Sequence, residues 1–227
     1  DNATGVAVDA NIILTFDENV VVGSGNITLK KSSDDSTVQT MPVGGGNVSA
    51  SGAVVTINPS ANLDSSQGYY IQIAATAFDD ASGNSYAGIS DKTSLSFTAA
   101  DVLGPTLSSS SPADNATGVA GGANIVLTFN ENVVLGSGNV SLYKTNGTLV
   151  EAMNVSSSAV TASTNTVTIN PTANLVTLEG YYILIDATAI DDASGNSYAG
   201  IGNSSALNFT AADLSPPTLT STSPADN

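Results

Sequence analysis

The sequence has 227 residues, of which 20 are acidic and 4 are basic, so its formal net charge is −16 at pH 7. It contains no His, Cys, Trp or Arg, which excludes cysteine nucleophiles, histidine bases, thiolate or imidazole metal sites and arginine phosphate clamps. The negative charge disfavours nucleic acid and anionic membranes and favours cations, and no apolar run approaches the ~20 residues that span a bilayer. We therefore expect a chain that is not an enzyme, does not bind nucleic acid and does not insert directly into a membrane.

Seven segments in the second half of the chain are predicted to be β-strands. In Asn124–Phe129, for example, the apolar side chains of Ile125, Leu127 and Phe129 recur at period two, which is typical of a strand with one buried face. In chain order the segments are Pro105–Ser110, Asn124–Phe129, Asn139–Tyr143, Leu149–Val155, Thr166–Ile169, Gly180–Ile185 and Ala206–Thr210. Turn signals separate them, and no stretch shows helical periodicity. The predicted fold class is all-β, and seven strands are the number in an immunoglobulin-like sandwich.

The chain is a tandem repeat. The motif DNATGVA begins at Asp1 and again at Asp114, and DDASGNSYAGI begins at Asp79 and at Asp191, 112 residues apart. A period of about 112 residues fits one β-sandwich and exceeds the 20–50 residues of solenoid repeats. We predict tandem immunoglobulin-like domains within a longer array. The expected parts are a repeat at 1–103 that lacks its own first strand, a complete repeat at 104–215, and the first strand of a third repeat at 216–227.

The order of motifs resembles a known family. PxLxSxSPADNATGV, ANIxLTFxENV, TINP, GYY, DDASGN and a closing FTA resemble the bacterial Ig-like repeats related to those of S-layer proteins, which occur in large numbers along giant calcium-dependent bacterial adhesins. The resemblance implies an extracellular location on the bacterial cell surface. It also implies a structural extender that projects a distal binding domain for cell adhesion, with neighbouring repeats as its partners. Two alternatives remain open: a module that binds carbohydrate or a host protein, and an accessory segment of an S-layer protein or secreted enzyme.

A candidate calcium site lies at one pole of each predicted domain. In a sandwich of this type, the loops after the second and sixth strands reach the N-terminal pole, where the incoming linker also arrives. Several oxygen ligands from different loops suit a structural Ca²⁺ ion, which takes ~6–8 of them. The candidate ligands are Asp101, Glu131, Asp191, Asp192 and Asn196 in the second repeat and Glu18, Asp79, Asp80 and Asn84 in the first. The simpler interpretation is that DDASGN is a turn, with Asp and Asn capping backbone groups and Gly83 or Gly195 at positive φ.

Two other features carry weaker predictions. Neither adjacent pair, Asp79-Asp80 or Asp191-Asp192, is expected to act as a glycosidase acid/base pair, because neighbours at a strand end point in opposite directions. One tyrosine of each pair, Tyr69-Tyr70 and Tyr181-Tyr182, is expected to face the core and the other the sheet surface, rather than to form a sugar platform.

The predicted absence of a first strand in the first repeat leads to a hypothesis about association. An incomplete sandwich exposes unpaired backbone groups at one edge. The segment Pro217–Pro224 has the sequence of an intact first strand. We therefore expect head-to-tail strand donation, in which this segment of one molecule completes the first repeat of another.

Overall fold

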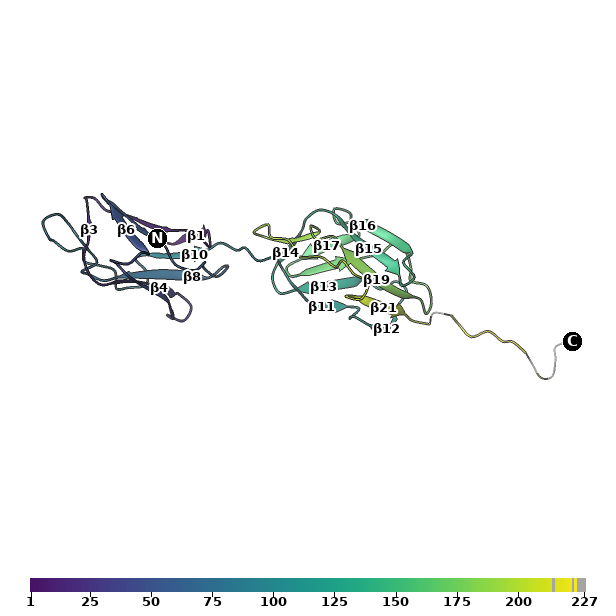
Figure 1. Ribbon diagram of the computed structural model, residues 1–227. Helices are drawn as coiled ribbons and strands as arrows, with labels where there is room; N and C mark the ends of the chain where they lie inside the picture. Colours follow the sequence, from purple (N-terminus) through teal and green to yellow (C-terminus); the bar gives the residue numbers. More distant parts are fainter. Residues whose placement is uncertain (214, 222, 224–227) are drawn as a thin grey trace. The chain divides into compact units, whose positions relative to one another are not determined.

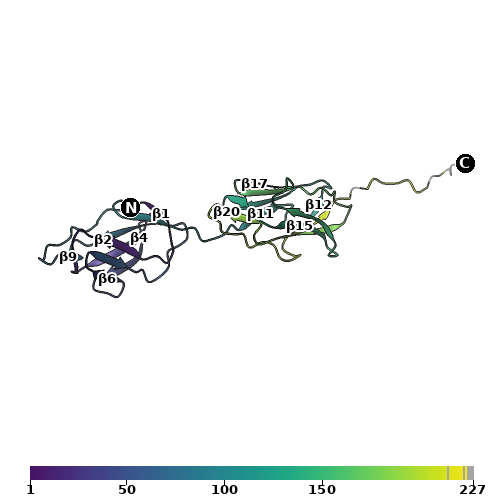
Figure 2. The ribbon, with the colours of Figure 1, turned by 90° about the horizontal axis from the view of Figure 1, so that it is seen from above.

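A computed structural model describes residues 1–213, 215–221 and 223 (Figure 1), and its described residues contain no helix. The chain divides into two compact units, Asp1–Val102 and Leu103–Asn227. Each unit is a set of short strands around its own hydrophobic core. Figure 2 shows the strands of each unit in a second view.

The first unit is built from strands β1 to β10. Their bounds are β1 Ala3–Val6, β2 Ile12–Thr15, β3 Val21–Val22, β4 Asn26–Lys31, β5 Thr37–Pro42, β6 Val48–Ser51, β7 Val54–Ile57, β8 Gly68–Ile73, β9 Phe78–Asp79 and β10 Ser96–Ala99. A five-stranded sheet has the order β1-β10-β8-β4-β5, and a three-stranded sheet has the order β2-β7-β6. The short strands β3 and β9 pair with each other.

The second unit repeats this plan and adds one strand. Its strands are β11 Leu107–Ser111, β12 Ala116–Val119, β13 Ile125–Phe129, β14 Val133–Leu135, β15 Asn139–Lys144, β16 Leu149–Asn154, β17 Val160–Ser163, β18 Thr166–Ile169, β19 Gly180–Ile185, β20 Ile190–Asp192 and β21 Asn208–Ala211. The five-stranded sheet is β12-β21-β19-β15-β16, and the small sheet is β14-β20. The third sheet, β11-β13-β18-β17, has four strands because β11 pairs with β13.

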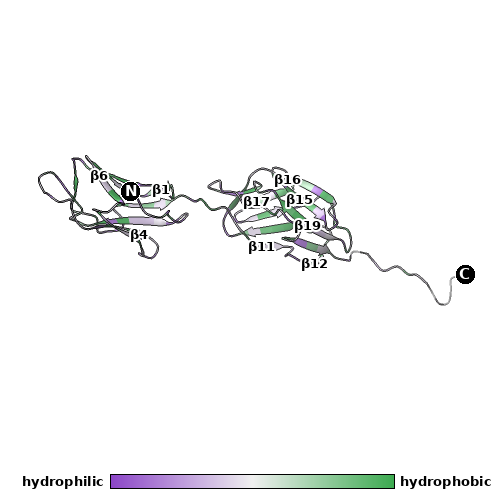
Figure 3. Cartoon of the chain, viewed as in Figure 1, coloured by the Kyte–Doolittle hydropathy of each residue, from purple (hydrophilic) through white to green (hydrophobic). Residues whose placement is uncertain are grey.

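Alternating side chains of the two larger sheets meet in the core of each unit. In the second unit, Ile125 and Leu127 of β13 are buried together with Val140 of β15 and Ile183 of β19, which belong to the facing sheet. Figure 3 shows that strands of both units carry hydrophobic as well as more hydrophilic residues. Burial of one face of each sheet against the other is the main stabilising contribution in such a sandwich.

The predicted all-β fold class is confirmed, and each of the seven predicted segments overlaps a strand. Four short strands of the second unit, β12, β14, β17 and β20, were not predicted. They are three or four residues long, too short for a periodic pattern, and backbone pairing with neighbouring strands defines them.

The predicted first strand of a third repeat at 216–227 falls partly outside the described residues, since 222 and 224–227 are not among them. Residues 215–221 are exposed and are not part of a sheet. In this part of the segment, the backbone N–H of Ser215 donates a hydrogen bond to Asp213 Oδ1 at 3.0 Å.

Candidate metal centre

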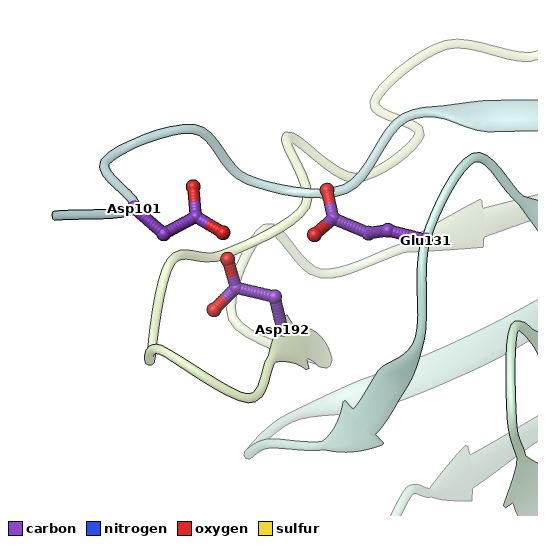
Figure 4. A group of neighbouring side chains, drawn as sticks. All are labelled: Asp101, Glu131 and Asp192. Carbon is purple, nitrogen blue, oxygen red and sulfur yellow. The ribbon is translucent and has the colours of Figure 1, made fainter. Parts of the chain in front are cut away.

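Three carboxylates converge where the chain enters the second unit. Asp101 lies on the segment that connects β10 to β11, Glu131 follows β13, and Asp192 ends β20. Each offers one oxygen atom, and these three oxygens lie within 4.8 Å of one another. Figure 4 shows the three side chains pointing toward a common region. This group, Asp101, Glu131 and Asp192, is called the acidic triad below.

Asp192 is held in place by its own loop. Its Oδ1 accepts hydrogen bonds from the backbone N–H groups of Ser194 and Asn196, both at 2.8 Å, and its Oδ2 accepts one from Asn196 Nδ2 at 2.7 Å. Gly195 has a φ of 88°, as the turn interpretation of DDASGN predicts. Burial raises the pKa of Asp192, but hydrogen bonds from Asn196, Ser194 and Gly195 together lower it by more, so the pKa lies below its ordinary value. The structure therefore keeps a charged carboxylate at a position that is only 3% exposed.

Asp191 and Asn196 have different surroundings from the triad. Asp191 Oδ1 accepts a hydrogen bond from Ser197 Oγ, and its Oδ2 lies 2.3 Å from where a Cβ on Gly136 would be. Asp191 thus points toward Gly136, on the other side of β20 from Asp192, because neighbouring residues of a strand point to opposite sides. Asn196 acts on the triad through Asp192, to which it donates two hydrogen bonds.

In the first unit, the predicted ligands do not form a comparable group among the described residues. Asp80 repeats the turn of Asp192, accepting hydrogen bonds from Ser82 N–H, Asn84 N–H and Asn84 Nδ2. These bonds, with that from the Asn84 side chain as the largest cause, hold the pKa of Asp80 below its ordinary value. Asp79 accepts from Ser85 Oγ, and Glu18 is exposed. The second unit differs because a connecting segment brings Asp101 to the corresponding loops.

The connecting segment packs closely on the second unit through residues that the search for ligands did not single out. A Cβ on Gly104 would lie 2.2 Å from the carbonyl oxygen of Ser197, so only glycine allows this approach. Thr106 N–H donates to Asn130 Oδ1 at 2.6 Å, and Asn130 N–H donates to Thr106 O at 3.0 Å. Pro105, between them, is buried. The only sequence signal for this contact is the Gly-Pro pair.

Asp101 also has a local role that its counterpart in the second unit shares. Ser65 Oγ donates to Asp101 Oδ1 at 2.9 Å, and Thr177 Oγ1 donates to Asp213 Oδ1 at 3.1 Å, 112 residues further on. Both aspartates therefore end a repeat in the same way. Asp213 serves below as the matched position for Asp101.

In each unit, one tyrosine of the pair lies in the core cluster and the other does not. Tyr181 is 1% exposed, whereas Tyr182 stacks on Tyr143 on the sheet surface with ring centroids 5.2 Å apart. In the first unit, Tyr69 belongs to the core cluster, whereas Tyr70 is buried outside that cluster. The hydroxyl of Tyr70 donates to Asp35 at 3.2 Å, and the Lys30 ammonium lies 5.8 Å from its ring centroid, so neighbouring polar side chains cover this ring.

Among the described residues, no helix is long and apolar enough to cross a membrane. A search of curated proteins finds no match to the chain. Among solved structures, the chain is similar to a biofilm-associated protein BSP domain, with 15% identity, a TM-score of 0.26 and coverage of 96% of this chain and 30% of that one. It is also similar to the FN1–FN3 domains of chicken CNTN1, with 9% identity, a TM-score of 0.25 and coverage of 93% and 66%.

The family comparison agrees with the repeat and with the two units. A model of the bacterial Ig-like domain matches residues 1–99 and again residues 101–211. The second match begins at Asp101, the triad residue on the connecting segment. The chain therefore belongs to the bacterial Ig-like domain family, of which it contains two consecutive members.

Proposed function

We propose that the chain is a spacer: an extender segment of a bacterial cell-surface adhesin that holds a distal binding domain away from the cell. Two features support this proposal. Each unit has a separate core, and the segment from β10 to β11 is short and contains Pro105, which restricts its backbone. Domains of this family are a non-enzymatic type, and we expect the chain to have no catalytic activity.

The spacer is proposed to bind one structural Ca²⁺ ion at the acidic triad. The observation that carries this proposal is the convergence of Asp101, Glu131 and Asp192, with three oxygens within 4.8 Å of one another. Carboxylate oxygens are the ligands that Ca²⁺ prefers, and water or backbone carbonyls commonly complete its shell. Without a cation, two such charges repel by about 1 kcal/mol at 4 Å in water and by more where they are partly buried.

Calcium would act mechanically in this spacer. Its bonds to Asp101 would tie the connecting segment to the two loops that carry Glu131 and Asp192, which limits rotation at Gly104. Mg²⁺ is expected to replace it poorly, because Mg²⁺ requires tight octahedral geometry and loses its water reluctantly. The extracellular location that we propose is compatible with this ion dependence.

The experiment is small-angle scattering with isothermal titration of calcium on residues 1–227. We expect one calcium site and a longer maximum dimension in calcium than in chelator. Asp101→Ala should remove most of both effects, whereas Asp213→Ala should keep them, because Asp213 has the same local serine/threonine bond but lies outside the triad. Identical scattering in calcium and chelator, or equal losses in the two variants, would contradict the proposal.

A further inference from the structure

The motif DNATGV, which occurs in both repeats, has a structural role outside the acidic triad. In the second unit it occupies residues 114–119 and contains β12, which pairs with β21 in parallel. Every other strand pair that the structure describes in this unit is antiparallel. In chain order β12 is the first strand of the five-stranded sheet and β21 is its last, so the chain enters and leaves this sheet through one parallel pair.

The residues of the motif explain how β12 fits the core. The register between the strands advances by three residues on β12, from Ala116 to Val119, but by only two on β21. Gly118, with a φ of 72°, lies in this bulge, where a positive φ favours glycine. Residues three apart on a regular strand point to opposite faces, but the bulge lets both Ala116 and Val119 pack against the core.

Hydrogen bonds hold this strand pair at both ends. At the start, Asp114 Oδ1 accepts bonds from the backbone N–H of Asn208 at 3.0 Å and from its Nδ2 at 2.9 Å. The backbone N–H of Asn115 donates to Asn208 O at 2.7 Å. At the other end, the N–H of Ala212 donates to Val119 O at 2.8 Å. The motif therefore fixes β12 to β21 along the whole length of the pair.

The first unit is built in the same way. There β1 pairs with β10 in parallel, and the N–H of Asn2 donates to Ser96 O at 2.7 Å. The N–H of Ala100 donates to Val6 O at 2.7 Å, and Asp1 Oδ1 accepts a bond from the N–H of Ser96 at 3.0 Å. The facing residue is serine in one unit and asparagine in the other, so these bonds depend on the motif and on the backbone that faces it.

A parallel pair at this place determines how the unit responds to tension along the chain. Tension pulls β12 from its N-terminal end and β21 from its C-terminal end. In a parallel pair these two ends lie at opposite edges, so the strands must slide past each other and all the bonds between them are loaded together. In an antiparallel pair the same two ends lie at one edge, and the bonds would separate one after another.

We propose that residues 114–119 and 208–212 form a mechanical clamp, called the parallel clamp below, that keeps the second unit folded when the chain is under tension. The proposal rests on the proposed spacer function, because a spacer between a cell and a bound target carries the tension between them. The clamp consists of backbone and side-chain groups of this chain, so its resistance requires no ion. It acts on the rate of unfolding, which governs forced unfolding.

The first test pulls the second unit in two directions with optical tweezers, in chelator. The chain has no cysteine, so handles attach only to introduced thiols. The pair Leu103→Cys and Ser215→Cys loads the clamp from opposite ends, whereas Ala120→Cys and Ser215→Cys loads both of its strands from their C-terminal ends. All three positions are exposed. We expect a higher unfolding force in the first geometry, and equal forces in the two geometries would overturn the proposal.

The second test isolates the clamp from β11, which is loaded only in the first geometry. Asp114→Ala removes two bonds to β21 and should raise the unfolding rate at constant force about tenfold in the first geometry. The matched control is Asn203→Ala, which removes two bonds within one turn, from the N–H and Oγ of Ser205. Both residues are exposed, so urea denaturation should show similar, small losses of stability.

The unfolding rates under load decide the outcome of this second test. Asn203→Ala should keep the rate of the parent protein, and equal rates for the two variants would overturn the clamp. Because these measurements are made in chelator, a failure of the clamp is distinguishable from a failure of the proposed spacer, which appears as identical scattering in calcium and in chelator.

Discussion

Calcium is expected to raise the melting temperature of the second unit by about 10 °C when free calcium is roughly 100 times its Kd. The physical reason is that the ion binds the folded triad and has no equivalent site in the unfolded chain. Glu131→Gln removes one charge with little change of shape, so most of this increase should be lost. Differential scanning calorimetry of residues 1–227 in calcium and in chelator measures it.

The same variant should have the opposite effect in chelator. Without the ion, the triad carboxylates repel, so Glu131→Gln should stabilise the unit by about 1 kcal/mol. The matched control is Glu18→Gln, the same position of the first unit, which is exposed and outside the triad. Glu18→Gln should leave the stability unchanged both in calcium and in chelator. If Glu131→Gln destabilised the protein equally in calcium and chelator, the residue would have a packing role and no role in binding calcium.

Gly200→Ala is expected to destabilise the second unit by about 3 kcal/mol. Gly200 has a φ of 77°, and a Cβ would lie 2.4 Å from Ile185 O. An L-residue in this backbone region costs about 1–2 kcal/mol. The clash also disturbs the two backbone hydrogen bonds between Ile185 and Ile201, each 2.9 Å long and worth about 0.5–1.5 kcal/mol.

The control for this prediction lies two residues further along the chain. Gly202 has no atom within 4 Å of a built Cβ, so Gly202→Ala should change the free energy of unfolding by less than about 0.5 kcal/mol. Gly88→Ala should reproduce the loss in the first unit, where a Cβ would lie 2.4 Å from Ile73 O. Urea denaturation measures the free energy of unfolding of all three variants. Equal stabilities of Gly200→Ala and Gly202→Ala would show that the loop shifts at little cost.

The main strands were predictable because alternation of the kind seen at Ile125, Leu127 and Phe129 is local information. The small sheet β14-β20 could not be predicted, because a strand of three residues is too short to show an alternating pattern of apolar side chains. The pairing of Val133 with Asp192 also depends on the tertiary fold. The opposite directions of Asp191 and Asp192 were predicted, but the predicted ligand set still included both, and only the structure shows that Asp192 lies with Asp101 and Glu131 while Asp191 lies against Gly136. The contact of Gly104 with Ser197 could not be predicted from the sequence either, because it joins residues that are far apart in the sequence.

The hydrogen bonds inside the loop of Asp192 have a kinetic consequence. Because Ser194 and Asn196 already orient this carboxylate, an ion that binds at the proposed site would meet a preorganised ligand, and the loop would not need to refold. Rapid mixing should then show ion capture as a single fast phase whose observed rate rises linearly with calcium. An adhesin with such spacers would follow fluctuations of external calcium with little delay, as a buffer does, rather than switch after a slow rearrangement.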